Sequence, residues 1–291
     1  MTTNRYAIAR EIAQLDPQAD NQRIMYLLNT YEHPWLMRKA LEFALFRTYA
    51  VPSISRLLQA TSQFQQHGQK RYDDTSLLIS TLVEAGYESD YGAEAIARMN
   101  HWHGRYRISN DDFRYVLSVF IYEPVRWTNR FGWRALTRGE QEAMYYFWRE
   151  VGNRMGIKDI PPTYDAFEAF NRAYERDHFV YANSNHVIGE ATVQIFLHWY
   201  PTWLRPAVRQ GIYALLDEPL RQAFGFPQTP AWVRQTLPMG LQLALAGQRL
   251  LPPRRTPYHF TKVPNRTYPE GFTVATLGPT HPVAVKEVEQ K

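Results

Sequence analysis

The protein is a chain of 291 residues without cysteine, and its 33 basic and 28 acidic residues give a formal net charge of +5. The lack of cysteine excludes a disulfide scaffold, thiolate catalysis, iron–sulfur clusters and covalently attached c-type haem. The basic residues are scattered in runs of at most two, so we expect no nucleic-acid partner. No apolar run approaches the roughly 18 residues that span a bilayer, and the N-terminus lacks the apolar region of a secretory signal.

Helical periodicity runs through most of the chain and predicts an all-α fold, globin-like or bundle-like, in a single domain. Capping signals at Ser109, Thr137 and Thr163 mark helix starts, and Thr229-Pro230 predicts another, with a kink or break near Pro238. The expected helices lie at about 20–31, 34–50, 53–65, 71–86, 89–103, 109–123, 137–155, 163–174, 203–217 and from 230 onward.

The chain divides into three parts by composition. Residues 1–19 are an N-terminal extension, and residues 20–251 are the all-α domain. Seven of the 40 residues from 252 to 291 are proline, and helical patterning stops there. This composition predicts an extended strap or a partly disordered tail with a charged end at 286–291.

Two histidines, His101 and His103, stand out near the end of the helix expected over 89–103. In a helix these positions are roughly 200° apart, so one ring faces inward and the other outward. In a loop, both rings could bind one metal ion. The ordinary alternative is that each histidine is a hydrogen-bonded or surface residue.

A second candidate group opens the helix expected over 71–86. Arg71 and Thr75 are four residues apart and share a helix face. The arginine can bind a carboxylate in bidentate fashion, and the threonine hydroxyl can donate to a bound oxygen species. On spacing alone the pair could equally be a capped helix start with an exposed cation.

The chain resembles the haem-dependent oxygenase family that includes bacterial latex-clearing protein and the fungal MpaB-type oxygenase, which cleaves the farnesyl chain in mycophenolic acid biosynthesis. The resemblance covers roughly residues 31–252 and is closest to the fungal branch. It rests on the order and spacing of six short segments, at 38–48, 52–58, 70–75, 95–100, 108–112 and 123–127.

The resemblance implies an all-α fold that holds non-covalent haem b, with one histidine as the proximal iron ligand. The family's ligand lies five residues after an arginine, which gives His103 here, with His101 as the rival. The residues that the resemblance implies are Arg71, Thr75 and Asp74 for catalysis, and His103, Arg71, Thr75, Arg98 and Asn100 for the cofactor.

Two departures from the family concern the substrate. Rubber-cleaving members can carry a lysine just before the threonine, where this chain has Asp74. They also have a catalytic glutamate upstream of the arginine, where residues 52–58 have no carboxylate. We therefore expect an oxygenase that acts with O₂ on a smaller lipophilic, isoprenoid-like substrate, and no cleavage of latex.

Two other interpretations stay open from the sequence. The first is a haem- or lipid-binding protein without turnover, for carriage or sensing. The second is a basic interaction module, for which the +5 charge and the Pro-rich tail would be the signature. We expect a cytoplasmic location, with peripheral contact to anionic lipid as an addition that the positive charge would assist.

Overall fold

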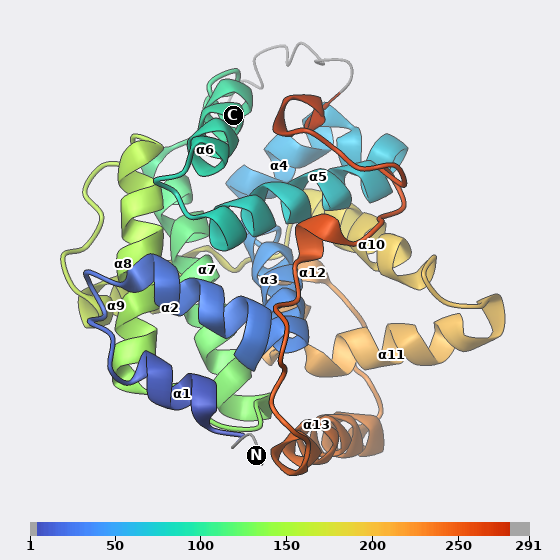
Figure 1. Ribbon diagram of the computed structural model, residues 1–291. Helices are drawn as coiled ribbons and strands as arrows, with labels where there is room; N and C mark the ends of the chain where they lie inside the picture. The colour runs from blue at the N-terminus through green and yellow to red at the C-terminus, as the bar shows by residue number, and fades with distance from the viewer. Residues whose placement is uncertain (1–4, 280–291) are drawn as a thin grey trace.

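The computed structural model describes residues 5–279, and every regular element in that range is a helix (Figure 1), which confirms the all-α fold. The η elements are 3₁₀ turns, except for η1, which is a π-helical turn. In chain order the elements are α1 (Ala7–Ile12), α2 (Asn21–Leu27), η1 (Leu28–Glu32), α3 (Pro34–Thr48), α4 (Pro52–Thr61), α5 (Gln63–Ala85), α6 (Asp90–His103), α7 (Asn110–Phe131), α8 (Arg138–Arg154), α9 (Tyr164–His178), α10 (Asn183–Leu197), η2 (Thr202–Leu204), α11 (Arg205–Leu215), α12 (Glu218–Phe224), α13 (Ala231–Ala246), η3 (Gly247–Leu250), η4 (Phe260–Lys262) and η5 (Val274–Thr276).

Helices α3 and α7 form the centre of the molecule and pack along each other (Figure 1). Both contribute to two groups of buried apolar side chains. One group includes residues of α2, α5, α6 and α8, and the other includes residues of α10, α11 and α12. The central pair therefore supports α5 and α6, the two helices that carry the candidate site residues.

The predicted capping signals are confirmed at three helix starts. The Ser109 hydroxyl accepts a hydrogen bond from the backbone N–H of Asp112 at 3.0 Å. Thr137 and Glu140 form a reciprocal capping box, and Thr163 caps α9. These side chains satisfy backbone donors that the first helical turn leaves without partners.

Several helix boundaries differ from the sequence prediction. Helix α5 begins at Gln63, so the expected interruption before residue 71 is helical apart from a kink at His67, where φ is −135° and ψ is 36°. Helix α7 continues through Pro124 to Phe131. Helix α13 begins at Ala231, after Pro230 as the N-cap residue, and continues through Pro238 without a break, with α11 and α7 packed against it.

The predicted helices do not include α1, α10 and α12. Helix α10 is buried between α4, α5 and the α11–α12 region, and some of its polar residues, such as Asn185 and Thr192, are buried as well. A helix buried on nearly all sides does not separate polar from apolar residues, so it lacks the one-sided periodicity that reveals a surface helix.

The Pro-rich segment 252–279, which we call the strap, runs over the outside of the helices from α13 past α5 (Figure 1). The Glu84 carboxylate accepts hydrogen bonds from the backbone N–H of Phe260 at 2.7 Å and from the Thr261 hydroxyl at 2.5 Å. Farther along, Val274 and Leu277 are buried at α6. The charged end at 286–291 lies outside the described residues.

No helix among the described residues is long and apolar enough to cross a membrane.

Candidate functional site

The turn between α5 and α6 fixes where the last turn of α6 lies. Gly86 has a positive φ of 82°, which glycine adopts without steric cost. Gly92, in the first turn of α6, lies so close to the Gly86 carbonyl that a Cβ atom would be 1.9 Å from its oxygen. The Ser89 hydroxyl caps this turn by accepting from the Gly92 N–H at 3.0 Å. Two glycines and one cap therefore hold α6 against α5.

The two candidate histidines at the end of α6 have different surroundings. His101 is exposed, its Nε2 lies 3.2 Å from Arg105 Nη2, and its ring contacts Trp102 edge-to-face. His103 points inward, with its ring centroid 5.5 Å from that of Phe113. The helical arrangement of the pair, one ring inside and one outside, is confirmed.

The half-buried His103 ring has properties that suit ligand binding. Its Nδ1 is enclosed and has no hydrogen-bond partner in the part of the chain that the structure describes. Burial, with a smaller contribution from the charge of Arg71, lowers the pKa of His103 to about 4. The imidazole is therefore neutral at physiological pH, and a neutral imidazole nitrogen is a good metal ligand.

Arg71 and Thr75 lie on the face of α5 that is turned toward His103. The Arg71 guanidinium donates to the Thr75 hydroxyl, which in turn donates to the Arg71 carbonyl at 3.0 Å. The guanidinium carbon lies 5.8 Å from the centroid of the Phe64 ring. Among the described residues no carboxylate pairs with Arg71, so its positive charge is available to an anionic group from outside the chain.

The aromatic residue Tyr49 adds to the apolar character around Arg71. Its side chain is buried, and burial raises the pKa of its hydroxyl to about 12, although the Arg71 charge opposes the increase. The ring centroids of Tyr49 and Phe64 are 5.1 Å apart. The arrangement thus places one unpaired cation and one neutral imidazole among aromatic rings.

Asp74, which the resemblance implied as a catalytic residue, lies on a different face of α5. Its carboxylate accepts from Lys70 Nζ at 2.8 Å and from the Tyr268 hydroxyl at 2.6 Å. Lys70 also donates to the Gly278 carbonyl at 2.7 Å. We call these four residues the latch, because they fasten the strap to α5. The structure does not bring Asp74 together with His103.

Arg98 and Asn100 also contact other parts of the chain. Arg98 Nε donates to the Leu277 carbonyl at 2.6 Å, which joins α6 to the strap. Asn100 Nδ2 donates to the Arg154 carbonyl at 3.2 Å, at the end of α8. Both side chains position α6 rather than sharing the surroundings of His103.

The segment 52–58 has Ser55 as its fully buried polar residue. The Ser55 hydroxyl donates to Asn185 Oδ1 at 2.5 Å and lies 2.8 Å from the hydroxyl of Ser184. The amide of Asn185 donates to the carbonyl of Ala50 at 2.8 Å. This region therefore offers a neutral hydrogen-bond network where rubber-cleaving relatives were expected to carry a carboxylate.

Sequence reasoning also missed a buried ionic cluster around Arg47. Its guanidinium makes a two-point contact with Glu175, at 2.9 and 2.6 Å, and lies 3.6 Å from Glu123. Burial alone would lower the pKa of Arg47, but the carboxylates around it, including Asp217, raise it well above its usual value. The available signal was that Arg47 and Glu123 both belong to segments that carried the family resemblance.

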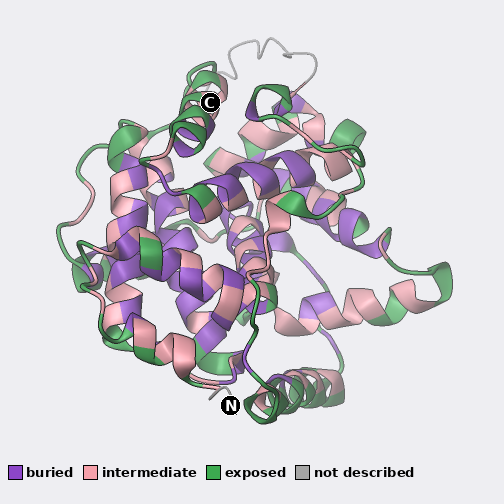
Figure 2. Cartoon of the chain, in the orientation of Figure 1, coloured by how far each residue is buried: buried purple, intermediate pink, exposed green. Residues whose placement is uncertain are grey.

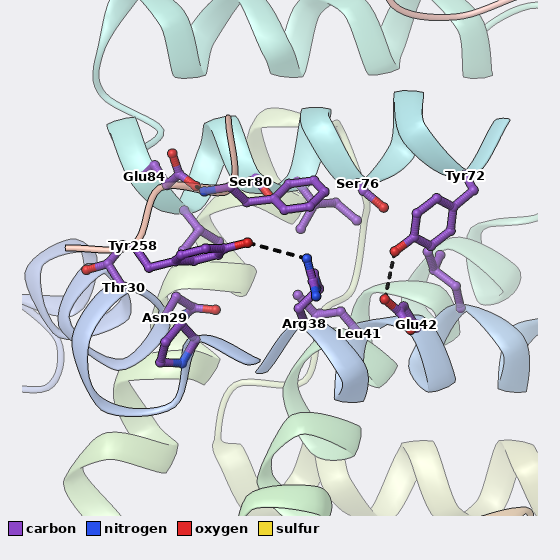
Figure 3. A pocket seen from close by; sticks show the side chains of 15 residues that line it. Asn29, Thr30, Arg38, Leu41, Glu42, Tyr72, Ser76, Ser80, Glu84 and Tyr258 are labelled. Carbon is purple, nitrogen blue, oxygen red and sulfur yellow. Dashed lines mark hydrogen bonds between the residues drawn. The ribbon is translucent and has the colours of Figure 1, made fainter. Parts of the chain in front are cut away.

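A separate pocket lies between α3, α5 and the strap, and Figure 3 shows it from close by. Arg38 and Glu42 line it from α3, Tyr72 lines it from α5, and Tyr258 lines it from the strap. The Tyr72 hydroxyl donates to Glu42 at 2.7 Å. Its other walls are largely apolar, and it holds a cavity of about 60 Å³. Because Tyr72 follows Arg71 directly, this pocket is on another side of α5 from the His103 side.

Fold and site together define an all-α protein with a neutral, unpartnered histidine beside an unpaired arginine in an aromatic environment. Comparison with known proteins assigns a family to this arrangement. The profile of the family "ER-bound oxygenase mpaB/B'/Rubber oxygenase, catalytic domain" matches residues 32–249. The chain belongs to this family, as its resemblance predicted.

Curated relatives from two fungi support the assignment. The ER-bound oxygenase mpaB' of Penicillium brevicompactum is 30% identical over 220 residues, which cover 69% of this chain and 52% of that protein. The ER-bound oxygenase mpaB of Penicillium roqueforti is 31% identical over 210 residues, covering 66% and 70%. The chain thus spans about half the length of the first of these relatives.

Proposed function

We propose that the protein is a haem b-dependent oxygenase that acts with O₂ on a lipophilic, unsaturated, isoprenoid-like substrate. The observation that carries the proposal is His103, a neutral imidazole whose enclosed Nδ1 has no partner among residues 5–279. A buried polar atom without a partner is costly, and a ligand from outside the chain removes that cost. Family membership supplies the oxygenase class.

The residues present fit a haem. Within residues 5–279 no group of three or more His, Cys, Asp or Glu side chains could hold a metal ion. Haem iron needs only one protein ligand, because the porphyrin supplies four nitrogens. His103 would be that ligand, and the unpaired Arg71 would bind a carboxylate of the cofactor. When bound, haem supplies an iron centre at which O₂ can be activated.

The chain's own residues perform three tasks in this mechanism. His103 stays neutral because burial disfavours its charged form, so a ring nitrogen remains available to the metal. Arg71 holds a positive charge on the same side, and its bond to the Thr75 hydroxyl fixes the guanidinium. The rings of Phe64 and Phe113 limit the access of water and provide apolar surface for an alkene substrate.

The proposed substrate class follows from what surrounds Ser55. Without a carboxylate there, the chain has no general base at the position expected from rubber-cleaving relatives. We therefore propose medium-length isoprenoid or unsaturated fatty chains as substrates, with no release of aldehydes from latex. The proposed location is cytoplasmic and peripheral to a membrane, where such chains are found.

The test is the absorption spectrum of the purified protein and of two histidine variants. We expect one acid–acetone-extractable haem per chain, a lost or strongly weakened Soret band for His103→Ala, and a nearly unchanged band for His101→Ala. His101 is the matched control, because it lies two residues away on the exposed side of α6. A colourless protein after expression with ample haem contradicts the proposal, and loss of the band in His101→Ala alone would move the ligand to His101. Oxygen consumption with an isoprenoid then separates an oxygenase from a carrier.

A further inference from the structure

A long stretch near the C-terminal end of the helical domain contains no acidic residue. Residues 219–269 include no Asp or Glu, although the chain has 28 acids in total. The same stretch carries seven basic residues, and the formal net charge of the whole chain is only +5, so the rest of the chain is slightly negative. The seven are Arg221, Arg234, Arg249, Arg254, Arg255, Lys262 and Arg266.

Helix α13 lies within this stretch and exposes large apolar side chains to solvent. Trp232, Met239 and Leu243 are 68%, 53% and 69% exposed. Spacings of seven and four residues correspond to nearly whole turns, so the three side chains form one stripe along the helix. Leu250 and Leu251, just after α13, are 90% and 60% exposed. We call these five residues the α13 stripe.

The fold itself does not need the α13 stripe. The helix is attached by its opposite side, where Pro238 and Leu245 are buried, and it packs against α11 and α7. Figure 2 shows the exposed side at the edge of the molecule, in green along α13. Helix α13 therefore has two apolar sides, and only one of them is buried within the described chain. Neighbouring exposed apolar side chains of this size mark an interaction surface.

The charges around the α13 stripe are positive, and they indicate what kind of partner the stripe binds. Arg234 follows Trp232 by two residues, and Arg249, Arg254 and Arg255 flank the exposed leucines at the other end. Arg234, Arg254 and Arg255 are exposed, and within the described chain none of them forms an ion pair, although Glu218 is near enough to Arg234 to feel its charge. A second copy of this chain would bring a like-charged surface to the contact. An apolar stripe with cations at both ends matches a bilayer, in which phosphates lie above the acyl chains.

We propose that the α13 stripe docks the protein on the surface of anionic lipid bilayers. Trp232, Met239 and Leu243 enter the boundary between head groups and acyl chains, with the helix parallel to the membrane plane. The flanking arginines contact lipid phosphates, and their aliphatic stems lie along the apolar boundary. This proposal specifies which surface would give the proposed peripheral location. It does not depend on haem or on turnover, because it is argued only from the exposure and charge of these residues.

The experiment measures co-sedimentation of the full chain with phosphatidylcholine vesicles, with and without phosphatidylserine. We expect wild type to bind the phosphatidylserine vesicles and to be released by high salt. The double variant Met239→Ser/Leu243→Ser should lower the partition coefficient at least about tenfold, since two apolar side chains no longer enter the lipid. Arg254→Gln/Arg255→Gln should lower binding roughly tenfold, and only to the anionic vesicles.

Tyr91→Ser is the matched control, because Tyr91 on α6 is as exposed as Met239, at 53%, and lies outside the basic stretch. It should bind like wild type. All three variants change exposed residues, and equal thermal unfolding curves show that each is folded. The proposal is overturned if wild type does not bind anionic vesicles, or if Tyr91→Ser loses as much vesicle binding as the variants of the α13 stripe. A dimer in light scattering that Leu243→Ser dissociates also overturns it, since the stripe would then bind a second copy.

Discussion

Asp74 offers the sharpest test of how the strap is held, because its carboxylate is the centre of the latch. Its side chain is 5% exposed and accepts from Lys70 Nζ with both oxygens, at 2.8 and 3.0 Å, and from the Tyr268 hydroxyl at 2.6 Å. Burial raises the pKa of Tyr268, and the Asp74 charge raises it further, so the phenol stays a donor. Asp74→Asn keeps the shape of the side chain and removes its charge.

The structure allows the cost of Asp74→Asn to be worked out. A hydrogen bond to a charged group contributes about 1.5–3 kcal/mol, and a neutral one about 1 kcal/mol. The amide oxygen retains one neutral bond, while Lys70 loses its counter-charge. Lys70 is 21% exposed and can reach water, which moderates the loss. We expect the free energy of unfolding to fall by about 2–3 kcal/mol.

Urea unfolding and hydrogen exchange measure the two consequences. The amides of the strap near Tyr268 and Leu277 should exchange faster in Asp74→Asn, while the core amides of α7 are affected only through global stability. Asp111→Asn is the control, because Asp111 forms an exposed pair with Arg114 and should cost at most about 1 kcal/mol. If Asp74→Asn leaves both unfolding and strap exchange at wild-type values but abolishes activity, Asp74 is a catalytic group and the latch reasoning is refuted.

Four further changes test the site and the fold. Gly92→Ala should displace α6 and lower cofactor retention, measured by the Soret absorbance, because its Cβ would meet a backbone carbonyl; retention at wild-type level argues against this packing. Arg71→Ala should reduce haem occupancy, whereas Thr75→Ala should reduce reactivity with oxygen more than occupancy; identical spectra and ligand binding in both would leave the pair as a helix start. Burial, together with Arg134, lowers the pKa of His33 to about 3. The unfolded chain binds this proton near pH 6.5, so the free energy of unfolding should fall as pH drops from 6.5 toward 3, by about 2 kcal/mol at pH 5. His33→Gln should remove that part of the slope in urea titrations, and an unchanged slope would exclude His33 as its origin.

Local features of the site could be predicted from the sequence because they depend on helix geometry. Spacing alone separates His101 from His103 by more than half a turn, which predicts one inward and one outward ring but not which of the two is inside. Arg71 and Thr75 contact each other for the same reason, since residues four apart meet on one helix face. These relations hold in any straight helix, whatever packs around it.

Contacts between distant parts of the chain could not be predicted in this way. Arg47 meets Glu175 across 128 residues, and Asp74 meets Tyr268 across 194. Both depend on how α3, α9 and the strap pack, and no periodicity within one element encodes that. The residue roles implied by the resemblance lack the same information. A motif gives the position of Asp74 in the chain, but it does not predict that Asp74 contacts Tyr268 on the strap.

Helix α5 connects the latch, the His103 side and the pocket, because three successive residues of this helix face these three parts of the molecule. Successive residues of a helix are 100° apart, so Lys70, Arg71 and Tyr72 each point to a different side of α5. Lys70 and Asp74 hold the strap, the pair that starts at Arg71 faces His103, and Tyr72 lines the pocket of Figure 3. A rotation of α5 that loosened the latch would turn the other two faces as well. Packing against α6 and α10 holds all three faces in place, and the latch adds a contact on the side of Lys70 and Asp74.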